Sequence, residues 1–199
     1  MSYKHLFLLN VKDELACIAM VNHSGELGAR HIYAGQIKAC KINGTSAQLD
    51  ELVEMYKSEL VHLEYFCNLI SQQAPINGFK QSLFNVVWQD LAFIMGFLSS
   101  AHSNALAMLL TQCVETVIET HYLEQLVLLD GIISIAQEPE HLALCTELRA
   151  NIYNFLQDEI EHKNHGIASS QGLNVWLRQF CITLFTFIVK FAIFASSRI

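Results

Sequence analysis

Two Glu-x-x-His pairs are the residues of this sequence whose types and spacing could do chemistry. They are Glu59 with His62 and Glu159 with His162. Residues three apart project from one face of a helix, so each pair brings a carboxylate and an imidazole to the same side. Carboxylates and imidazoles with open coordination positions suit iron or manganese.

Both pairs lie within apolar stripes that predict the buried face of a helix. The two stripes, in steps of three and four residues, are Leu52, Met55, Glu59, His62, Phe66 and Leu69, and then Leu148, Ile152, Phe155, Glu159 and His162. An ionised side chain on such a face is costly unless a partner compensates it. The spacing therefore predicts charged groups inside a core.

Each pair follows a helical stripe that carries one more glutamate and a tyrosine in a Glu-x6-Tyr pattern. Glu26 with Tyr33 precedes the first pair, and Glu115 with Tyr122 precedes the second. The two stripes are Leu15, Ala19, Asn22, Glu26 and Tyr33, and then Met108, Glu115, Ile118, Tyr122 and Leu129. The pattern indicates a two-helix repeat that is used twice.

Four glutamates on one core require positive charge, and the chain offers little of it. No Lys or Arg lies between Lys80 and Arg149. Two divalent metal ions would balance the four carboxylates. One Glu from each of two helices and Glu-x-x-His from each of two others is the ligand set of ferritin-like di-iron or di-manganese bundles. The alternative for any single glutamate is a place at the edge of its stripe, from which it reaches water.

A third Glu-x-x-His pair shows that the short motif alone is not specific. Glu138 and His141 straddle Pro139, which is placed for the first turn of a helix. We expect this pair to lie outside the metal site.

Apolar residues at a spacing of 3.6 predict six helices and no strands. Stop and start signals at Asn43-Gly44, Ala74-Pro75, Ser103-Asn104 and Pro139 divide them. The predicted helices cover about 13–42, 46–73, 80–98, 104–130, 139–166 and 171–196. The predicted fold is all-α: one domain over residues 1–199, with a ferritin-like four-helix core about 13–73 and 104–166, an apolar crossover helix about 80–98 and a C-terminal apolar helix about 171–196.

The composition narrows the class of protein further. Of the 199 residues, 52% are hydrophobic and 16% are charged, and only 9 Gly and 2 Pro are present. These values disfavour disorder, collagen-like repeats and turn-rich all-β folds. Residues 1–161 carry 8 basic and 19 acidic groups, so they offer no continuous basic surface, and we expect no nucleic-acid partner.

The cysteines and the two ends of the chain bear on its location. The six cysteines lie far apart and predict reduced, buried side chains in a cytosolic compartment. The N-terminal residues lack the pattern of a targeting peptide. The segment from Trp176 to Phe194 is apolar almost all round. It could pack on the bundle or lie in a membrane surface, and we favour peripheral association with the cytoplasmic face of the cell membrane.

Several stretches together resemble one known family. They are Asn22-His23-Ser24-Gly25-Glu26-Leu27-Gly28-Ala29, Ile32-Tyr33-Ala34-Gly35-Gln36, Val114-Glu115 through His121-Tyr122, and Asp158-Glu159-Ile160-Glu161-His162. In these stretches the chain resembles the demethoxyubiquinone hydroxylases, the di-iron monooxygenases of ubiquinone biosynthesis. The resemblance covers about residues 20 to 190.

The resemblance implies a ligand set and a reaction. Two iron ions would be held by Glu26, Glu59, His62, Glu115, Glu159 and His162, with Glu59 and Glu159 bridging. Tyr33, His121 and Tyr122 are expected beside these ligands. O2 would be the co-substrate for hydroxylation of a demethoxyubiquinone or demethoxyubiquinol ring, and the electron donor stays open between a reduced quinone and NADH.

The resemblance also implies partners, and two other classes of protein remain as alternatives. An isoprenoid quinone taken from a bilayer would be the substrate, and other ubiquinone-biosynthesis proteins would be partners. The first alternative is another ferritin-like di-iron oxidase or peroxidase. The second is a non-catalytic helical protein at a membrane surface. Metal content and rescue of ubiquinone synthesis separate these three hypotheses.

Overall fold

The computed structural model describes residues 3–44, 48–136 and 138–198. The helices are α1 Tyr3–Asn43, α2 Leu49–Asn77, α3 Asn85–His102, α4 Asn104–Ile135, α5 Pro139–Ser169 and α6 Val175–Ser196. No strand occurs in these three ranges. The prediction of six helices in an all-α fold is confirmed.

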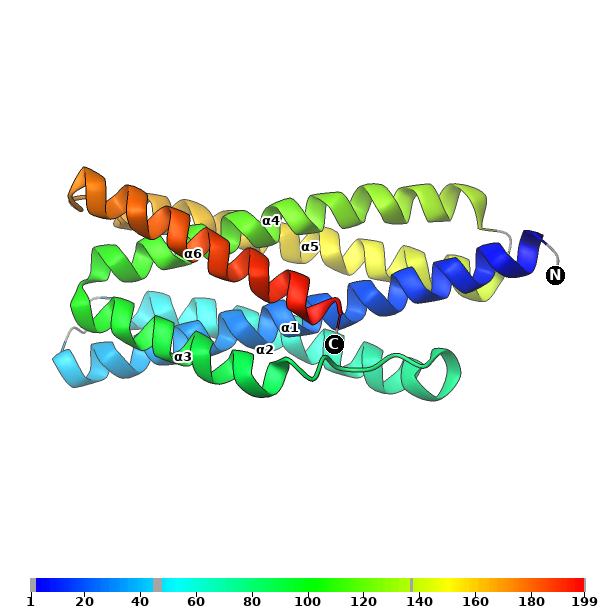
Figure 1. Ribbon diagram of the computed structural model, residues 1–199, viewed down its shortest axis with the longest axis horizontal. Coiled ribbons are helices and arrows are strands. Elements are labelled where there is room, and N and C mark those ends of the chain that lie inside the picture. The colour runs from blue at the N-terminus through cyan, green and yellow to red at the C-terminus, as the bar shows by residue number, and fades with distance from the viewer. Residues whose placement is uncertain (1–2, 45–47, 137, 199) are drawn as a thin grey trace.

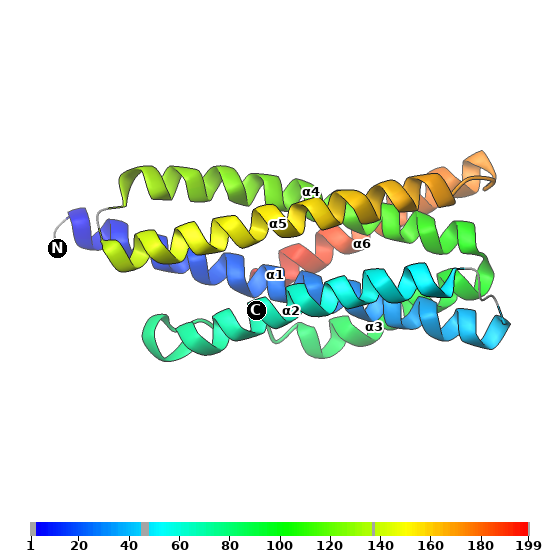
Figure 2. The ribbon, with the colours of Figure 1, turned by 180° about the vertical axis from the view of Figure 1, so that it is seen from behind.

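Four long helices form the bundle, and two shorter ones cover one side of it. α1 packs on α2 and α3, α4 packs on α5, and α6 packs on α4 and α1 (Figure 1). The view from behind shows α2 and α5 on the opposite side from α3 and α6 (Figure 2). α3 forms the crossover between the α1–α2 pair and the α4–α5 pair, as in a ferritin-like helical bundle.

The apolar stripes of the four long helices meet in the centre of the bundle. Leu52 and Phe66 of α2 are 1% and 0% exposed, and Leu148 and Ile152 of α5 are both 0% exposed. The polar residues that the stripes include are buried with them. Burial of these apolar side chains drives the assembly, and it carries the glutamates and histidines inward.

The predicted ends of α1 and α2 differ from the structure. α1 begins at Tyr3, ten residues before the predicted start, because no Gly or Pro interrupts the chain there. α2 continues through Pro75 to Asn77, so the predicted end before this proline is wrong. The helix ends at Gly78, which adopts a left-handed φ of 72° and donates its N–H to Ala74 O. The predicted start near Ser46 lies outside the described residues.

The serines near residue 100 extend α3 instead of ending it. Ser99 Oγ donates to Gly96 O, and Ser100 Oγ donates to Gln36 O across the contact with α1. Hydroxyls that bond in this way are satisfied within a helix. The break comes at Ser103, whose side chain accepts from Leu106 N and caps α4, as predicted.

Three other boundaries differ by a few residues. α3 begins at Asn85, five residues later than predicted. α5 continues to Ser169, beyond the predicted end near Gly166. α6 begins at Val175, after Asn174 accepts a hydrogen bond from Trp176 N. A side-chain cap marks the start of α6, whereas the start of α3 has no side-chain cap and the end of α5 is closed by the N–H of Ser170 bonded to Gly166 O, and apolar periodicity does not locate these ends.

Two glycines let α1 and α3 approach closely. A Cβ atom at Gly96 would lie 2.0 Å from Ile32 O, and one at Gly35 would lie 2.2 Å from Phe93 O. Any larger residue at either position would push the helices apart. This contact fixes α3 against the helix that carries Glu26.

Candidate metal centre

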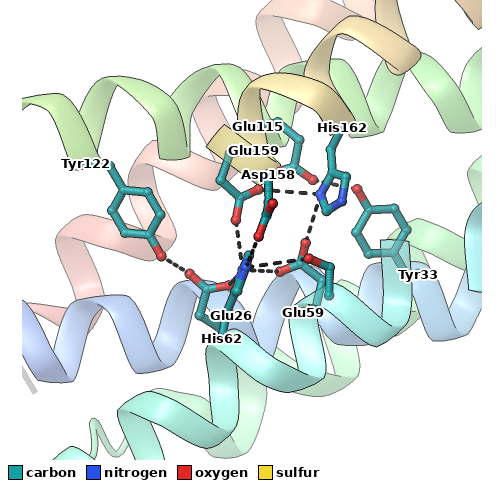
Figure 3. Close-up of polar contacts among 10 residues, drawn as sticks. Glu26, Tyr33, Glu59, His62, Glu115, Tyr122, Asp158, Glu159 and His162 are labelled. Carbon is teal, nitrogen blue, oxygen red and sulfur yellow. Dashed lines mark hydrogen bonds and ion pairs between the residues drawn. The ribbon is translucent and has the colours of Figure 1, made fainter. Parts of the chain in front are cut away.

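The six predicted ligands converge at the middle of the four long helices. α1 supplies Glu26, α4 supplies Glu115, and α2 and α5 each supply one Glu-x-x-His pair (Figure 3). The four glutamates and His62 are at most 1% exposed, and His162 is 8% exposed. The structure thus brings together all six residues from four separate helices.

The six side chains form two overlapping groups of ligand atoms. One group contains Glu26, Glu59, His62 and Glu159, and the other contains Glu59, Glu115, Glu159 and His162. Within each group one ligand atom from every residue lies within 4.8 Å of the others. Glu59 and Glu159 belong to both groups, which is the arrangement that two bridging carboxylates require.

Each imidazole faces carboxylates of both Glu-x-x-His pairs. His62 Nδ1 lies 3.1 Å from Glu159 Oε1 and 3.5 Å from Glu26 Oε2. His162 Nδ1 lies 3.2 Å from Glu59 Oε1 and 3.7 Å from Glu159 Oε2. The two Nδ1 atoms therefore point at the shared carboxylates and into the centre.

Every one of the six residues has a buried polar atom without a hydrogen-bond partner. These atoms are Glu26 Oε2, Glu59 Oε1 and Oε2, His62 Nδ1, Glu115 Oε2, Glu159 Oε1 and Oε2, and His162 Nδ1. Buried polar atoms are normally paired, and a cluster of unpaired ones calls for an explanation. Oxygen and imidazole nitrogen donors that face a common point fit a pair of divalent metal ions.

Burial and mutual repulsion disturb the titration of the carboxylates. Burial, and next the charges of Glu159 and Glu26, raise the pKa of Glu59 well above its usual range. Burial, and next the charges of Glu159 and Glu59, do the same to the pKa of Glu115. Burial opposes ionisation of Glu159 as well, but the facing imidazoles of His162 and His62 outweigh it and lower its pKa to about 2.

The histidines show the complementary effect. Burial lowers the pKa of His62, but the facing carboxylates of Glu159 and Glu26 outweigh burial and raise this pKa to about 12. The pKa of His162 is raised for the same kind of reason, with Glu159 as its main partner. Without metal, protons therefore supply the positive charge in this cluster, and bound metal ions would displace them.

Two tyrosines donate hydrogen bonds to Glu26 and Glu115, the glutamates that each belong to only one of the two ligand groups. Tyr33 of α1 donates its hydroxyl to Glu115 Oε1 of α4 at 2.6 Å, and Tyr122 of α4 donates to Glu26 Oε1 of α1. Burial, followed by the facing carboxylate, raises the pKa of each phenol well above its usual range. Both phenols thus stay protonated donors, and the other oxygen of each carboxylate faces the centre.

One residue beside the centre was missed by the sequence analysis. Asp158 Oδ2 lies 3.0 Å from His62 Nε2, on the side of the ring opposite the cluster. A carboxylate in this position fixes the orientation of a metal-binding imidazole. Its position next to Glu159 in the sequence could have identified it. The residue before a buried one lies at the edge of the buried face, within reach of the neighbouring helix.

Two other predictions concern residues outside the cluster. His121 Nε2 lies 2.7 Å from Gln125 Nε2, and no hydrogen bond joins it to the six residues within the described ranges. Glu138 and His141 form their own ion pair at 3.2 Å, far along α5 from Glu159. The third Glu-x-x-His pair thus lies outside the site, as predicted.

An apolar pocket lies among α1, α3, α4 and α6. Its walls include Gly25, Trp88, Val114, Val189 and Ala192. Gly25 and Val114 directly precede Glu26 and Glu115. The pocket therefore lies where α3 and α6 cover α1 and α4, and none of the six ligand residues is among its walls.

The fold and the site define a ferritin-like helical bundle with a buried carboxylate and histidine centre. The family described as ubiquinone biosynthesis protein COQ7 matches residues 13–196 of this chain. The chain therefore belongs to the COQ7 family. This assignment agrees with the resemblance in the first, fourth and fifth helices.

Curated relatives come from eukaryotes and bacteria. The NADPH-dependent 3-demethoxyubiquinone 3-hydroxylase of Dictyostelium discoideum is 32% identical over 182 residues, which cover 92% of this chain and 76% of the relative. The 3-demethoxyubiquinol 3-hydroxylase of Rhodospirillum rubrum is 28% identical, over 75% of this chain and 62% of its own length. The 5-demethoxyubiquinone hydroxylase of Saccharomyces cerevisiae is 30% identical, over 75% and 64%.

Proposed function

We propose that this protein is a di-iron monooxygenase that hydroxylates the ring of a demethoxyubiquinone or demethoxyubiquinol in ubiquinone biosynthesis. The observation that carries the proposal is the convergence of four glutamates and two histidines whose inward atoms have no hydrogen-bond partner. Membership of the COQ7 family and the hydroxylase names of its relatives support the substrate and the reaction.

The six residues would divide between two iron ions. Glu26 and His62 would hold one ion, Glu115 and His162 would hold the other, and the shared carboxylates would bridge them. When bound, the iron pair supplies activation of O2, with one oxygen atom added to a ring carbon and the other released as water. Burial of the ligands keeps bulk water from this centre.

The reaction needs two electrons and two protons in addition to O2 and the ring. The relative from Dictyostelium discoideum is named as NADPH-dependent. We therefore propose a reduced nicotinamide as the electron source. The sequence left the electron donor open between a reduced quinone and a reduced nicotinamide.

The ring would approach through the apolar pocket beside Glu26 and Glu115. Trp88 of α3 and Val189 of α6 line this pocket. An isoprenoid tail could then leave between the two covering helices. This route places the tail on the side of the molecule that exposes the most apolar surface.

That side is the proposed membrane contact. α6 is long and apolar enough to cross a membrane, with a mean hydropathy of 1.8 and 28% of its most apolar window buried. One face of the helix packs on the bundle through Phe185 and Val189, while Trp176 and Phe187 are 85% and 68% exposed. A helix that is bound to the protein on one face and apolar on the other suits the surface of a bilayer.

α3 adds to the same contact. Leu83, Val86 and Leu98 are 72%, 68% and 60% exposed. Figure 1 shows α3 and α6 on one side of the molecule. Cys17, Cys67, Cys113, Cys145 and Cys181 are free thiols, which fits a reducing compartment and a contact with the cytoplasmic face.

Metal analysis and genetic rescue test the proposal. Protein made with iron should contain close to two irons per chain, and the gene should restore ubiquinone in a bacterial strain that lacks its demethoxyubiquinone hydroxylase. Glu159→Gln should abolish the rescue, whereas Glu138→Gln in the unrelated pair should retain it. Protein that binds no metal after reconstitution would refute the iron site. Iron-loaded protein that leaves the demethoxy precursor unconverted would refute the substrate.

A further inference from the structure

The repeat that α1 and α4 share extends beyond the glutamate and the tyrosine. Each helix carries a small polar residue, then Glu, then Tyr, then Gln at the same spacing. The residues are Asn22, Glu26, Tyr33 and Gln36 in α1, and Thr111, Glu115, Tyr122 and Gln125 in α4. All eight side chains are at most 4% exposed.

These side chains pair across the two helices in four successive steps. Asn22 pairs with Gln125, Glu26 with Tyr122, Tyr33 with Glu115, and Gln36 with Thr111. Residue numbers rise along α1 as they fall along α4, so the helices are antiparallel. The two inner pairs contain the glutamates, and each glutamate has its own outer pair one helical turn away.

The outer pair beside Glu26 is a closed amide pair. Asn22 Nδ2 donates to Gln125 Oε1 at 2.9 Å, and Gln125 Nε2 donates to Asn22 Oδ1 at 2.8 Å. Gln125 Nε2 also lies 2.7 Å from His121 Nε2. An amide nitrogen can only donate, so His121 Nε2 must accept, and the proton of the neutral imidazole lies on Nδ1. Three hydrogen bonds to two side chains therefore fix one orientation of Gln125.

The outer pair beside Glu115 is built differently. Gln36 Nε2 donates to Ala107 O at 3.0 Å and to Thr111 Oγ1 at 3.4 Å. Gln36 Oε1 is buried without a hydrogen-bond partner. This pair is attached mainly to the backbone of α4, and it constrains the helices without a closed ring of bonds.

We propose that the Asn22–Gln125 pair positions Glu26 and that the Gln36–Thr111 pair positions Glu115, so that each metal ion has its own alignment device in the interface of α1 and α4. The inference rests on the proposed di-iron function, because it assigns Glu26 and Glu115 to separate ions. Within the described residues, no hydrogen bond joins either outer pair to the six ligand residues, so both act through the helices and the tyrosines.

The physical reason is the cost of misalignment in a dry interface. A shift of α1 along α4 would break both hydrogen bonds between the Asn22 and Gln125 amides and leave buried donors and acceptors unpaired. The same shift would separate the Tyr122 hydroxyl from Glu26 Oε1. The amide pair thus holds the register in which one carboxylate oxygen bonds to the phenol and the other faces the cluster.

Titration with Co(II), used as an air-stable probe for Fe(II), tests the assignment. Visible absorption and calorimetry would resolve two binding steps in the unchanged protein. Glu26→Ala and Glu115→Ala identify which step belongs to which ion, because each removes a ligand of one group. The test variant carries Asn22→Leu with Gln125→Met, which replaces both amides by apolar groups of similar length.

The expected result is selective. The test variant should bind the ion beside Glu26 about tenfold more weakly, with the ion beside Glu115 changed less than about twofold. The matched variant, Gln36→Leu with Thr111→Val, should show the opposite selectivity. Exchange of the amides, Asn22→Gln with Gln125→Asn, should restore most of the affinity because it keeps a reciprocal pair.

Other outcomes distinguish failure of the positioning roles from failure of the proposed di-iron function. Equal loss of both ions in either double variant, or no loss in either, would overturn the positioning roles. If Asn22→Leu with Gln125→Met does not fold, the matched variant and the amide exchange decide by the same criteria. Failure of the unchanged protein to bind two ions would overturn the proposed di-iron function instead.

Discussion

The centre of the bundle and the face made by α3 and α6 depart from the usual burial pattern in opposite directions. In the centre, Glu59, Glu115 and Glu159 are 0% exposed. On the outer face, Trp176 and Val175 of α6 are 85% and 78% exposed. Glutamate is seldom fully buried, and large contiguous apolar surfaces are seldom left in water.

Under the proposed function, this difference assigns metal binding to the centre and membrane contact to the outer face. Ionisable groups in a dry interior are costly for folding, and they suit the binding of metal ions. Exposed aromatic side chains are costly in water, and they suit contact with lipid and with a lipid-soluble substrate. The apolar pocket lined by Gly25 and Trp88 is the proposed route from one region to the other.

The largest expected effect comes from a carboxylate that both ligand groups share. Glu59→Ala should abolish binding of both metal ions, because Glu59 belongs to both groups. Glu26→Ala should leave one ion bound, because Glu26 belongs to one group. Metal content by mass spectrometry measures the difference, with the exposed Glu64→Ala as control. Retention of two ions by Glu59→Ala would contradict the assignment.

Removal of metal should lower the melting temperature of the protein, and only through loss of the ions bound at the centre. At a free metal concentration 100 times Kd, bound metal stabilises the fold by about 2.7 kcal/mol, which corresponds to roughly 5 to 11 °C in Tm for a chain of this size. Thermal unfolding with and without a chelator measures the shift. The same treatment of Glu59→Ala should leave its Tm unchanged, and an equal shift there would point to metal bound elsewhere.

Asp158 should matter less than the residues that face the centre. Asp158→Asn keeps the shape of the side chain but removes the charge that faces His62 Nε2. Metal affinity should fall about 10- to 100-fold. Glu161→Gln on the same helix serves as control, and equal affinities for the two variants would show that Asp158 does not orient His62.

On the outer face, a single aromatic residue should affect membrane binding but not metal content. Phe180 is 64% exposed on α6. Phe180→Ser should weaken binding to anionic vesicles about tenfold, because one ring no longer enters lipid. Val61 is 61% exposed on α2, a helix that Figure 2 shows on the side opposite α6, so Val61→Ser should bind vesicles normally. Loss of binding in both variants would refute a contact through α6.

The smallest effect belongs to an ordinary surface ion pair. Lys57 Nζ and Glu54 Oε1 lie 2.6 Å apart, and both side chains are more than half exposed. Lys57→Ala should lower the free energy of unfolding by about 0.5 kcal/mol or less, with no change in metal or vesicle binding. Denaturant unfolding measures it, and a larger loss would show that this pair does more than a typical surface contact.

The residues of the centre could be predicted because each one interrupts an apolar stripe. The stripe that runs from Leu52 to Phe66 can only be buried as a whole, so Glu59 and His62 are buried with it. Helix ends were harder to predict. Pro75 lies in the last turn of α2, and the helix ends at Gly78, where a left-handed residue closes it.

Contacts between residues distant in the sequence were beyond prediction from periodicity. The pairing of Asp158 with His62 depends on how α2 and α5 face each other. The approach of α1 to α3 depends on Gly35 and Gly96, which read simply as helix-weakening residues in the sequence. Neither contact follows from the spacing within one helix.

The sequence by itself determined that four helices would carry glutamates and histidines on their buried faces, because helical period and hydrophobic burial act on each helix separately. Only the tertiary structure decided which atoms meet. Antiparallel packing of α1 and α4 brings Tyr33 to Glu115 and Tyr122 to Glu26. The register of two helices is a property of both, since it depends on every pair of side chains in their interface.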